Sequence, residues 1–293
     1  MSSPARFHRF ALIGALALLA AACSKEDAQT AAVADHATPE AAVLHSVKLL
    51  RQGDFGGMIE ASAPPARVEA AKQHWMSELK KDEITDEERA EFAATMERLT
   101  APDAEQQMMA EIRPQLEQFQ GEMKAQLPAM VAMGKGFILA AVNESEDIAA
   151  EQKPQVTNLV NALGTWAESG EFASVERAER AVAAIAATAR KLPVRTLDEV
   201  QALDFDGIAN LMSIGFGGVK DVLNVYDINI DQTLDGARAE TISQEGDTAT
   251  VRVHFDLLGA PLNIDVPMVR IDGRWYGKDA IENLDKPAVA EGP

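Results

Sequence analysis

The sequence predicts an α+β fold, in which an N-terminal helical region is followed by an antiparallel β-meander of four to five strands. Through most of residues 38–200, apolar residues recur every three or four positions, as on one face of a helix. Between 226 and 277 they alternate with polar residues, as in strands with one buried face. Two Asp-Gly pairs, at 235–236 and 272–273, supply turns that favour a meander.

The N-terminus has the pattern of an export signal. Arg6 and Arg9 make the start positively charged, and residues 10–19 form an apolar run, shorter than the roughly 20 residues of a membrane span. Alanines then lead into Cys23, the only cysteine. This arrangement resembles the signal of bacterial lipoproteins, in which the cysteine is lipidated and the chain is cut just before it. That family usually has leucine where this chain has Ala20.

The resemblance to lipoproteins implies where the protein is located in the cell. Residues 1–22 would be the removed signal peptide, Cys23 would carry palmitate-type acyl chains, and residues 23–37 would form a flexible tether. Ser24 implies transfer to the outer membrane, with the body facing the periplasm, or the outer face of the membrane in a cell that has only one. The alternative, a secretory signal with a chance cysteine, would leave an exported thiol without a disulfide partner.

Helix signals dominate residues 38–200. Thr38 predicts the N-cap of a first helix, and Gly53 predicts its end. Pro114 predicts a kink or a break in a later helix. The stretch after Pro128 is the most apolar one downstream of the signal. We therefore expect a helical hairpin or a small bundle in this region.

The sheet region is predicted to span residues 201–285. The run 226–230 reads as a first strand, and the runs 248–257 and 262–271 show the clearest alternation. Pro267 predicts an edge position or a bulge, because proline cannot donate a hydrogen bond to a neighbouring strand. The remaining residues, 286–293, are predicted to be a disordered tail.

The opening segment "TPEAAVLHSVKLLRQGDF" and the closing segment "VRIDGRWYGKDAI" resemble small bacterial lipoproteins of the nuclear transport factor 2-like, cystatin-like α+β class. The resemblance covers residues 38–62 and 207–285. It implies a curved antiparallel sheet that wraps a long helix and encloses a mostly apolar pocket. The helical middle would then be an insertion; if it packs independently, the chain is a helical domain followed by a β-meander domain.

Charge narrows the possible partners. Without Arg6 and Arg9, which leave with the signal, 25 basic residues face 46 acidic ones, a net charge of −21. Such a chain repels phosphate backbones, so we expect no nucleic-acid partner. The membrane would be a partner only through the lipid on Cys23. With 47% apolar residues, the rest of the chain can form a core.

Motifs of catalysis are absent. Cys23 is assigned to lipidation, His36 falls in the predicted tether, and His254 falls on the polar face of its strand. In the nuclear transport factor 2-like class, a pocket carboxylate with a tyrosine can be catalytic, but Tyr226 and Asp227 are adjacent and would point to opposite faces of a strand. We expect no catalytic residues, no metal and no cofactor.

Two apolar stretches rich in methionine and glycine provide candidate ligand-binding residues. They are Met130, Met133 and Phe137 in the first stretch, and Met212 and Phe216 in the second. Methionine adapts to ligands of varied shape. The alternative is that these residues fill a core poor in aromatic side chains, because methionine stripes on helices usually pack inward.

These observations predict a lipid-anchored, non-enzymatic protein of the bacterial envelope that binds a hydrophobic small molecule or a protein partner. A structural or accessory subunit of an envelope complex, without a ligand, is the alternative. An isomerase- or dehydratase-like enzyme is the weaker alternative. An apolar pocket with one buried carboxylate would favour a ligand or catalysis, and an exposed apolar patch would favour a partner.

Overall fold

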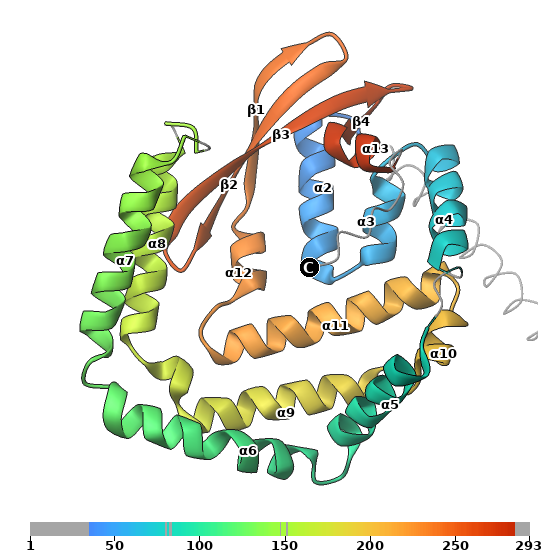
Figure 1. Cartoon of the computed structure of the whole chain (residues 1–293). Helices are drawn as coiled ribbons and strands as arrows, with labels where there is room; N and C mark the ends of the chain where they lie inside the picture. The colour runs from blue at the N-terminus through green and yellow to red at the C-terminus, as the bar shows by residue number, and fades with distance from the viewer. Residues whose placement is uncertain (1–34, 80, 82–83, 147, 151, 285–293) are drawn as a thin grey trace, which may run out of the picture.

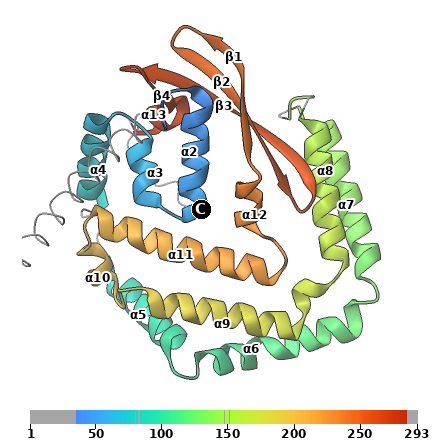
Figure 2. The ribbon, with the colours of Figure 1, turned by 180° about the vertical axis from the view of Figure 1, so that it is seen from behind.

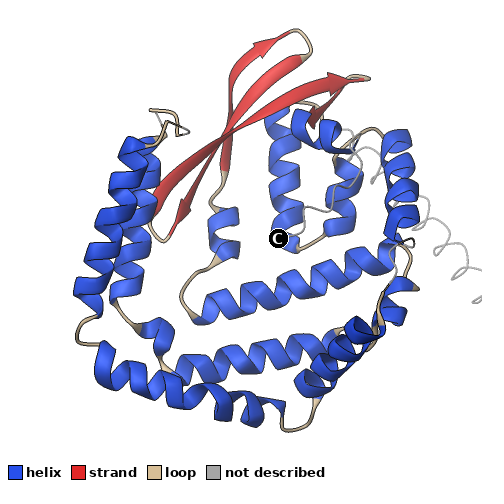
Figure 3. Cartoon of the chain, viewed as in Figure 1, coloured by secondary structure: helices blue, strands red, loops and turns tan. Residues whose placement is uncertain are grey.

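The computed structural model describes residues 35–284, except 80, 82–83, 147 and 151. The predicted signal peptide, Cys23, most of the predicted tether and the predicted tail lie outside the described residues. Within the described residues the chain forms helices first and an antiparallel sheet near the C-terminus (Figures 1 and 3). This confirms the predicted α+β fold class.

Four strands form the sheet in sequence order, and each pairs antiparallel with the next. They are β1 (Arg238–Glu245), β2 (Thr248–Leu257), β3 (Ala260–Ile271) and β4 (Arg274–Gly277). The turn pairs Leu258-Gly259 and Asp272-Gly273 have φ angles between 50° and 78°. Two central residues with positive φ make the tight turn that suits neighbouring antiparallel strands.

The strand expected at 226–230 is not formed. Tyr226 ends a helix, Asp227 has a φ of 63°, and a short helix, α12 (Ile230–Asp235), follows. The side chain of Asn229 accepts a hydrogen bond from the backbone N–H of Gln232 and so caps α12. Three alternating apolar residues are a weak strand signal, and a good N-cap residue among them favours the helix.

Pro267 lies in β3, between β2 and β4. The pairing of β3 with β4 begins only at Met268, so at Pro267 one side of β3 has no neighbouring strand. The irregularity of the sheet is elsewhere, in β1 between Thr241 and Ser243. Pro267 thus occupies an edge position, one of the two alternatives that its lack of a donor predicted.

The described residues form twelve α-helices. They are α2 (Pro39–Gln52), α3 (Phe55–Ala61), α4 (Pro65–Leu79), α5 (Asp86–Thr100), α6 (Ala104–Gln118), α7 (Leu127–Glu144), α8 (Lys153–Glu168), α9 (Val175–Lys191), α10 (Leu197–Gln201), α11 (Phe205–Val225), α12 and α13 (Lys278–Leu284). A π-helical segment (Phe119–Met123) extends α6, and a 3-10 turn (Glu171–Ala173) precedes α9. Helices therefore continue well past residue 201, where the sheet region was predicted to begin.

Helix α2 begins and ends where its sequence predicts. The Thr38 side chain accepts a hydrogen bond from the backbone N–H of Ala41, and Gly53 closes the helix with a φ of 69°. Pro114 does not break α6, which continues to Gln118. The sharp change of direction, by 90°, comes between Met123 and Leu127, where α6 with its π-helical extension gives way to α7.

The elements form a ring in both views (Figures 1 and 2). The sheet closes one side, the α7–α8 hairpin a second, α6 and α9 a third, and α5, α10 and α4 the rest. Helix α11 crosses the interior between α9 and α3. The ring closes where α8 packs against β3, because the Gln155 amide bonds the backbone N–H and carbonyl of Asn263, at 2.8 and 2.9 Å.

The main core lies between α2 and the sheet. Ala42 and Val43 of α2 pack with Val251 and Val253 of β2 and with Trp275 of β4. The first described helix and the last strands therefore share one core, and α5 to α9 lie between them in the sequence. A smaller cluster joins α4, β4 and α13, and another joins α6 to α9.

No single described helix has both the length and the apolar composition to cross a membrane. Only α6 with its extension, taken together with α7 across the 90° bend, meets these two criteria.

Candidate functional site

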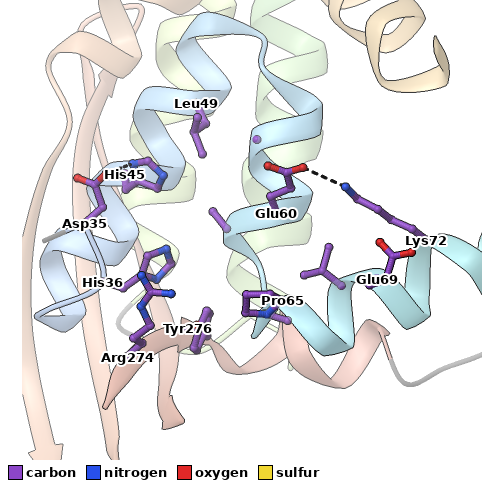
Figure 4. Close-up of a pocket in the computed structure, with 14 residues that line it drawn as sticks. Asp35, His36, His45, Leu49, Glu60, Pro65, Glu69, Lys72, Arg274 and Tyr276 are labelled. Atoms are coloured by element: carbon purple, nitrogen blue, oxygen red, sulfur yellow. Dashed lines mark hydrogen bonds and ion pairs between the residues drawn. The ribbon is translucent and has the colours of Figure 1, made fainter. Parts of the chain in front are cut away.

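A cavity of about 550 Å³ lies among α2, α3, α4 and β4 (Figure 4). Its ionisable lining residues are Asp35, His36, His45, Glu60, Glu69, Lys72, Arg274 and Tyr276. They come from opposite ends of the described chain, and the fold brings them together because α2 packs on the last strand.

Strand β4 supplies Arg274 and Tyr276. Residues two apart in a strand share one face, so both side chains reach the cavity, while Trp275 between them packs in the core under the sheet. In Figure 4 the Arg274 guanidinium lies beside the His36 ring. The short strand thus presents a cation and an aromatic ring to the same space.

His36 is built into the cavity wall. Its side chain is buried, its backbone carbonyl accepts a hydrogen bond from Trp275 N at 3.0 Å, and its ring Nδ1 lies 2.7 Å from the Trp275 carbonyl oxygen. The prediction that the flexible tether reaches residue 37 is therefore wrong at His36. A carbonyl accepts but does not donate, so Nδ1 carries the proton and Nε2 of the neutral ring is an acceptor. Burial lowers the pKa of His36, which the bond to Trp275 and nearby Asp35 only partly offset.

A second histidine lies next to the first. The ring centroids of His36 and His45 are 5.8 Å apart, and the Tyr276 ring is 5.0 Å from His36. His45 Nδ1 is 3.1 Å from Asp35 Oδ2, within ion-pair distance but without hydrogen-bond alignment. A carboxylate at this distance can orient the imidazole ring.

The two cations of the cavity differ in their partners. Lys72 forms an ion pair with Glu60 at 3.0 Å and lies over the Phe205 ring. Arg274 forms no ion pair with a carboxylate of the described residues. Its guanidinium can therefore bind an external anion, and its planar fork suits a carboxylate or a phosphate.

An apolar cavity of about 310 Å³ adjoins the polar one under the sheet. The two share His36, Ala61 and Tyr276. Apolar side chains of α2, α3, β2 and β3 form most of the second lining, among them Val47, Leu50, Met58, Val253, Val266 and Met268. Ile264, also in this lining, is 53% exposed. Together the cavities offer an apolar compartment and a polar one with a cation.

Two further hollows flank α11. One, of about 350 Å³, is an apolar groove lined by residues of α5, α9 and α11, including Met96, Ile185 and Val219. The other, also about 350 Å³, lies among α9, α11 and α12, where Lys220 pairs with Asp231 at 2.7 Å. In this polar hollow, Lys220 is already paired with a carboxylate of the fold, Asp231.

The structure places the five predicted ligand-binding residues on two separate helices. Met130, Met133 and Phe137 lie on α7 and are exposed. Met212 and Phe216 lie on α11, where Met212 is exposed and the Phe216 ring packs edge-on against Phe55 at 5.5 Å. None of the five lines the four cavities described above.

The pair weighed for catalysis has structural contacts instead. The Tyr226 carbonyl accepts a hydrogen bond from Trp166 Nε1 at 2.8 Å, and burial raises the pKa of Tyr226. Asp227 forms an ion pair with Arg177 at 2.8 Å. His254 lies on the exposed face of β2, 3.1 Å from Glu240. These residues are remote from the cavity that contains His36 and Arg274.

The sequence does not predict that His36, His45, Arg274 and Tyr276 line one cavity. The only local signal was the spacing of Arg274 and Tyr276, which places them on one face of a strand. Nothing in the sequence pairs them with histidines more than 200 residues away, the separation of His36 and Trp275 being 239.

Among the described residues, no group of three or more His, Cys, Asp or Glu side chains is arranged to hold a metal ion. Comparisons of the chain with protein-family models, with curated proteins and with solved structures find no match. The geometry of the paired cavities is therefore the basis for a functional proposal.

Proposed function

We propose that this chain is a lipid-anchored, non-enzymatic protein of the bacterial envelope whose body binds an amphiphilic anion. The acidic group of the ligand would bind at Arg274 in the polar cavity, and its hydrocarbon part would occupy the adjoining apolar cavity. The signal-like start and Cys23 support the anchor and an outer-membrane, periplasm-facing location. The observation that carries the binding proposal is a guanidinium that has no carboxylate partner among the described residues and lies beside an apolar compartment.

The two compartments supply different parts of the affinity. A charge-assisted bond from Arg274 fixes the position of the head group. Each methylene transferred from water into the apolar cavity contributes about 0.8 kcal/mol. The neutral ring of His36, at the junction, offers Nε2 to a ligand hydroxyl or to a protonated acid group. This arrangement selects a molecule that has both an anionic end and an apolar end.

The test uses decanoate and decanol as probes, which differ in the anionic group. Isothermal titration calorimetry on the parent chain should show tighter binding of decanoate. Arg274→Gln should weaken decanoate binding about tenfold or more, because a hydrogen bond to a charged group is lost, and should leave decanol binding unchanged. The matched control is Arg252→Gln, because Arg252 is a half-buried arginine of β2 that pairs with Asp265 and lines neither cavity.

Two results would overturn the proposal. One is that neither probe binds the parent chain. The other is that Arg274→Gln and Arg252→Gln bind decanoate equally well. Either would leave the accessory-subunit alternative, in which the chain acts by contact alone.

One observation favours a second candidate function. Asp35, His36, His45 and Tyr276 line one cavity, in which a carboxylate lies beside the His45 ring and a phenol ring lies beside the His36 ring, and groups of these kinds can transfer protons. An isomerase or a dehydratase would use this arrangement. Chromatography and mass spectrometry of the ligand extracted after incubation distinguish the two functions. A binding protein leaves the ligand unchanged. An isomerase changes its chromatographic retention, and a dehydratase lowers its mass by that of one water molecule.

A further inference from the structure

Helix α7 is apolar on all sides but lies on the outside of the ring. Its inner face, which includes the buried Leu127 and Val142, packs against α8. In both ribbon views α7 lies outward of α8 (Figures 1 and 2). A helix that is apolar all round is normally buried in a core or in a membrane. The outer face of α7 therefore requires a partner that the described fold does not provide.

The outer face carries large exposed side chains. Met130, Met133, Phe137 and Ile138 are 43, 62, 71 and 52% exposed, and Ala132 and Gly136 between them are exposed as well. A Cβ added at Gly134 or Gly136 would meet no atom within 4 Å, so no other element packs there. Phe137 and Met133 have the highest exposed fractions of the large apolar residues in the part of the chain described.

Charge is absent from the middle of this face, and the exposed Glu144 lies at its C-terminal end. The charged residue within the apolar stretch is Lys135, which turns to the inner side: its aliphatic chain packs at Gly164, and its amine lies 3.8 Å from Glu168. The protein as a whole is strongly acidic. An electrostatic partner would need charges on the contact surface, so the outer face fits an uncharged apolar medium.

The size of the face argues against a second copy of this chain. A helix of 18 residues is about 27 Å long and about 10 Å wide, which gives a face of roughly 270 Å². A stable protein interface buries about 800 Å² on each partner. A convex single helix would therefore make too small a dimer contact. Hydrocarbon chains need no matching surface and surround a convex ridge.

We propose that α7 lies in the plane of a lipid bilayer surface, with Met130, Met133, Phe137 and Ile138 among the acyl chains. Helices that lie in the plane of a membrane surface bury their apolar face about 5–10 Å into the boundary between head groups and acyl chains. The composition of α6 and α7 together meets the criteria for a membrane segment, and the 90° bend between them suits a surface position. The insertion does not depend on a cavity ligand. If Cys23 is lipidated, a stretch of 12 residues up to Asp35 can span at most about 40 Å, which keeps the body at the membrane.

The test measures the depth of one side chain. The full chain is reconstituted in vesicles of phosphatidylcholine that carries bromine on its acyl chains, which quenches tryptophan in the hydrocarbon region. The probe variant is Phe137→Trp. The matched control is Ile242→Trp, at a position of β1 that is also exposed. The signal of Trp75, Trp166 and Trp275 is removed by subtracting the parent chain.

We expect strong quenching of the tryptophan at 137 and none of the one at 242. Equal quenching at both positions, or none at 137, overturns the proposal. A tryptophan at 137 that is shielded only at high protein concentration, with dimers in sedimentation equilibrium, also overturns it and assigns the face to a second copy. Flotation of the Cys23→Ser chain with the same vesicles tests the anchor separately, so that failure of the anchor and failure of α7 insertion are distinguishable.

Discussion

His36 joins the start of the described chain to the last strand of the sheet. Its backbone and its ring both bond to Trp275, and its ring forms part of two cavities. Burial lowers the pKa of this histidine, so that the folded protein holds it neutral where the unfolded chain would be protonated. The residue therefore couples the stability of the fold, and of the wall that the two cavities share, to pH.

The sign of this coupling is fixed by the direction of the shift. Because the folded pKa is lower than the usual 6.5, the contribution to stability is complete above pH 6.5 and is lost as the pH falls towards the folded pKa. Urea unfolding of the parent chain should show this loss between neutral and mildly acidic pH. His36→Gln should flatten that dependence, whereas His254→Gln, on the exposed face of β2, should keep it. The same slope in both variants would contradict the assignment.

The residue scale is also where the sequence is least informative. The roles of Thr38 and Gly53 can be predicted from the local sequence, because N-cap positions and positive φ angles have strong residue preferences. The roles of His36 and Arg274 depend on which distant strand α2 packs against. The five predicted ligand-binding residues stand out in the sequence only because their side chains are apolar and adaptable. Residues of this kind occur in cores, on surfaces and in pockets alike.

Among the elements, α9 and α11 show how glycine sets helix packing. A Cβ added at Gly218 of α11 would lie 2.5 Å from Thr188 Cγ2 of α9, whereas one added at Gly217 would meet nothing within 4 Å. Gly218 thus allows the two helices to approach, and Gly217 has no contact that requires glycine.

These two glycines predict opposite effects of one substitution. Gly218→Ala should lower the free energy of unfolding by about 1–3 kcal/mol through overpacking. Gly217→Ala should raise it by about 1 kcal/mol, because alanine is the better helix former. Chemical unfolding of both variants is the measurement. Equal effects of both substitutions would mean that α9 and α11 do not pack as closely as described.

At the element scale the sequence predicted much of the sheet. Two features were sufficient to predict the last three strands: the alternation in β2 and β3, and the turn at Asp272-Gly273. Alternation of apolar and polar residues is a strong strand signal when it continues over ten residues. The run 226–230 misled because it is short and contains the N-cap Asn229. Helix α11 (Phe205–Val225) continues the helical region past residue 201, where the sheet region was predicted to begin.

The ring of the whole molecule closes where α8 packs against β3, and one polar side chain bonds the backbone there. The Gln155 amide acts as a neighbouring strand would, bonding both the donor and the acceptor of Asn263 at an edge of β3. Gln155→Ala removes both bonds, each worth about 0.5–1.5 kcal/mol. Hydrogen exchange should then become faster in α8 and in residues 260–266, while exchange in β2 stays slow.

Asn158→Ala is the matched control for this prediction, because Asn158 is an exposed residue of the same helix. It should leave exchange in residues 260–266 unchanged. If Gln155→Ala also leaves it unchanged, the ring is held closed by the apolar contacts of α8 rather than by the amide.

The pairing of α2 with the last strands also determines the order in which the chain can fold. Helix α2 is the first described element to emerge from a ribosome or an export channel, and Trp275, which covers it, follows more than 200 residues later. Ala42 and Val43 have no sheet to pack on until residues 248–277 have passed. The core beneath the sheet is therefore completed only after Trp275 has been synthesised or exported, and a chain shortened before β4 would lack both cavities.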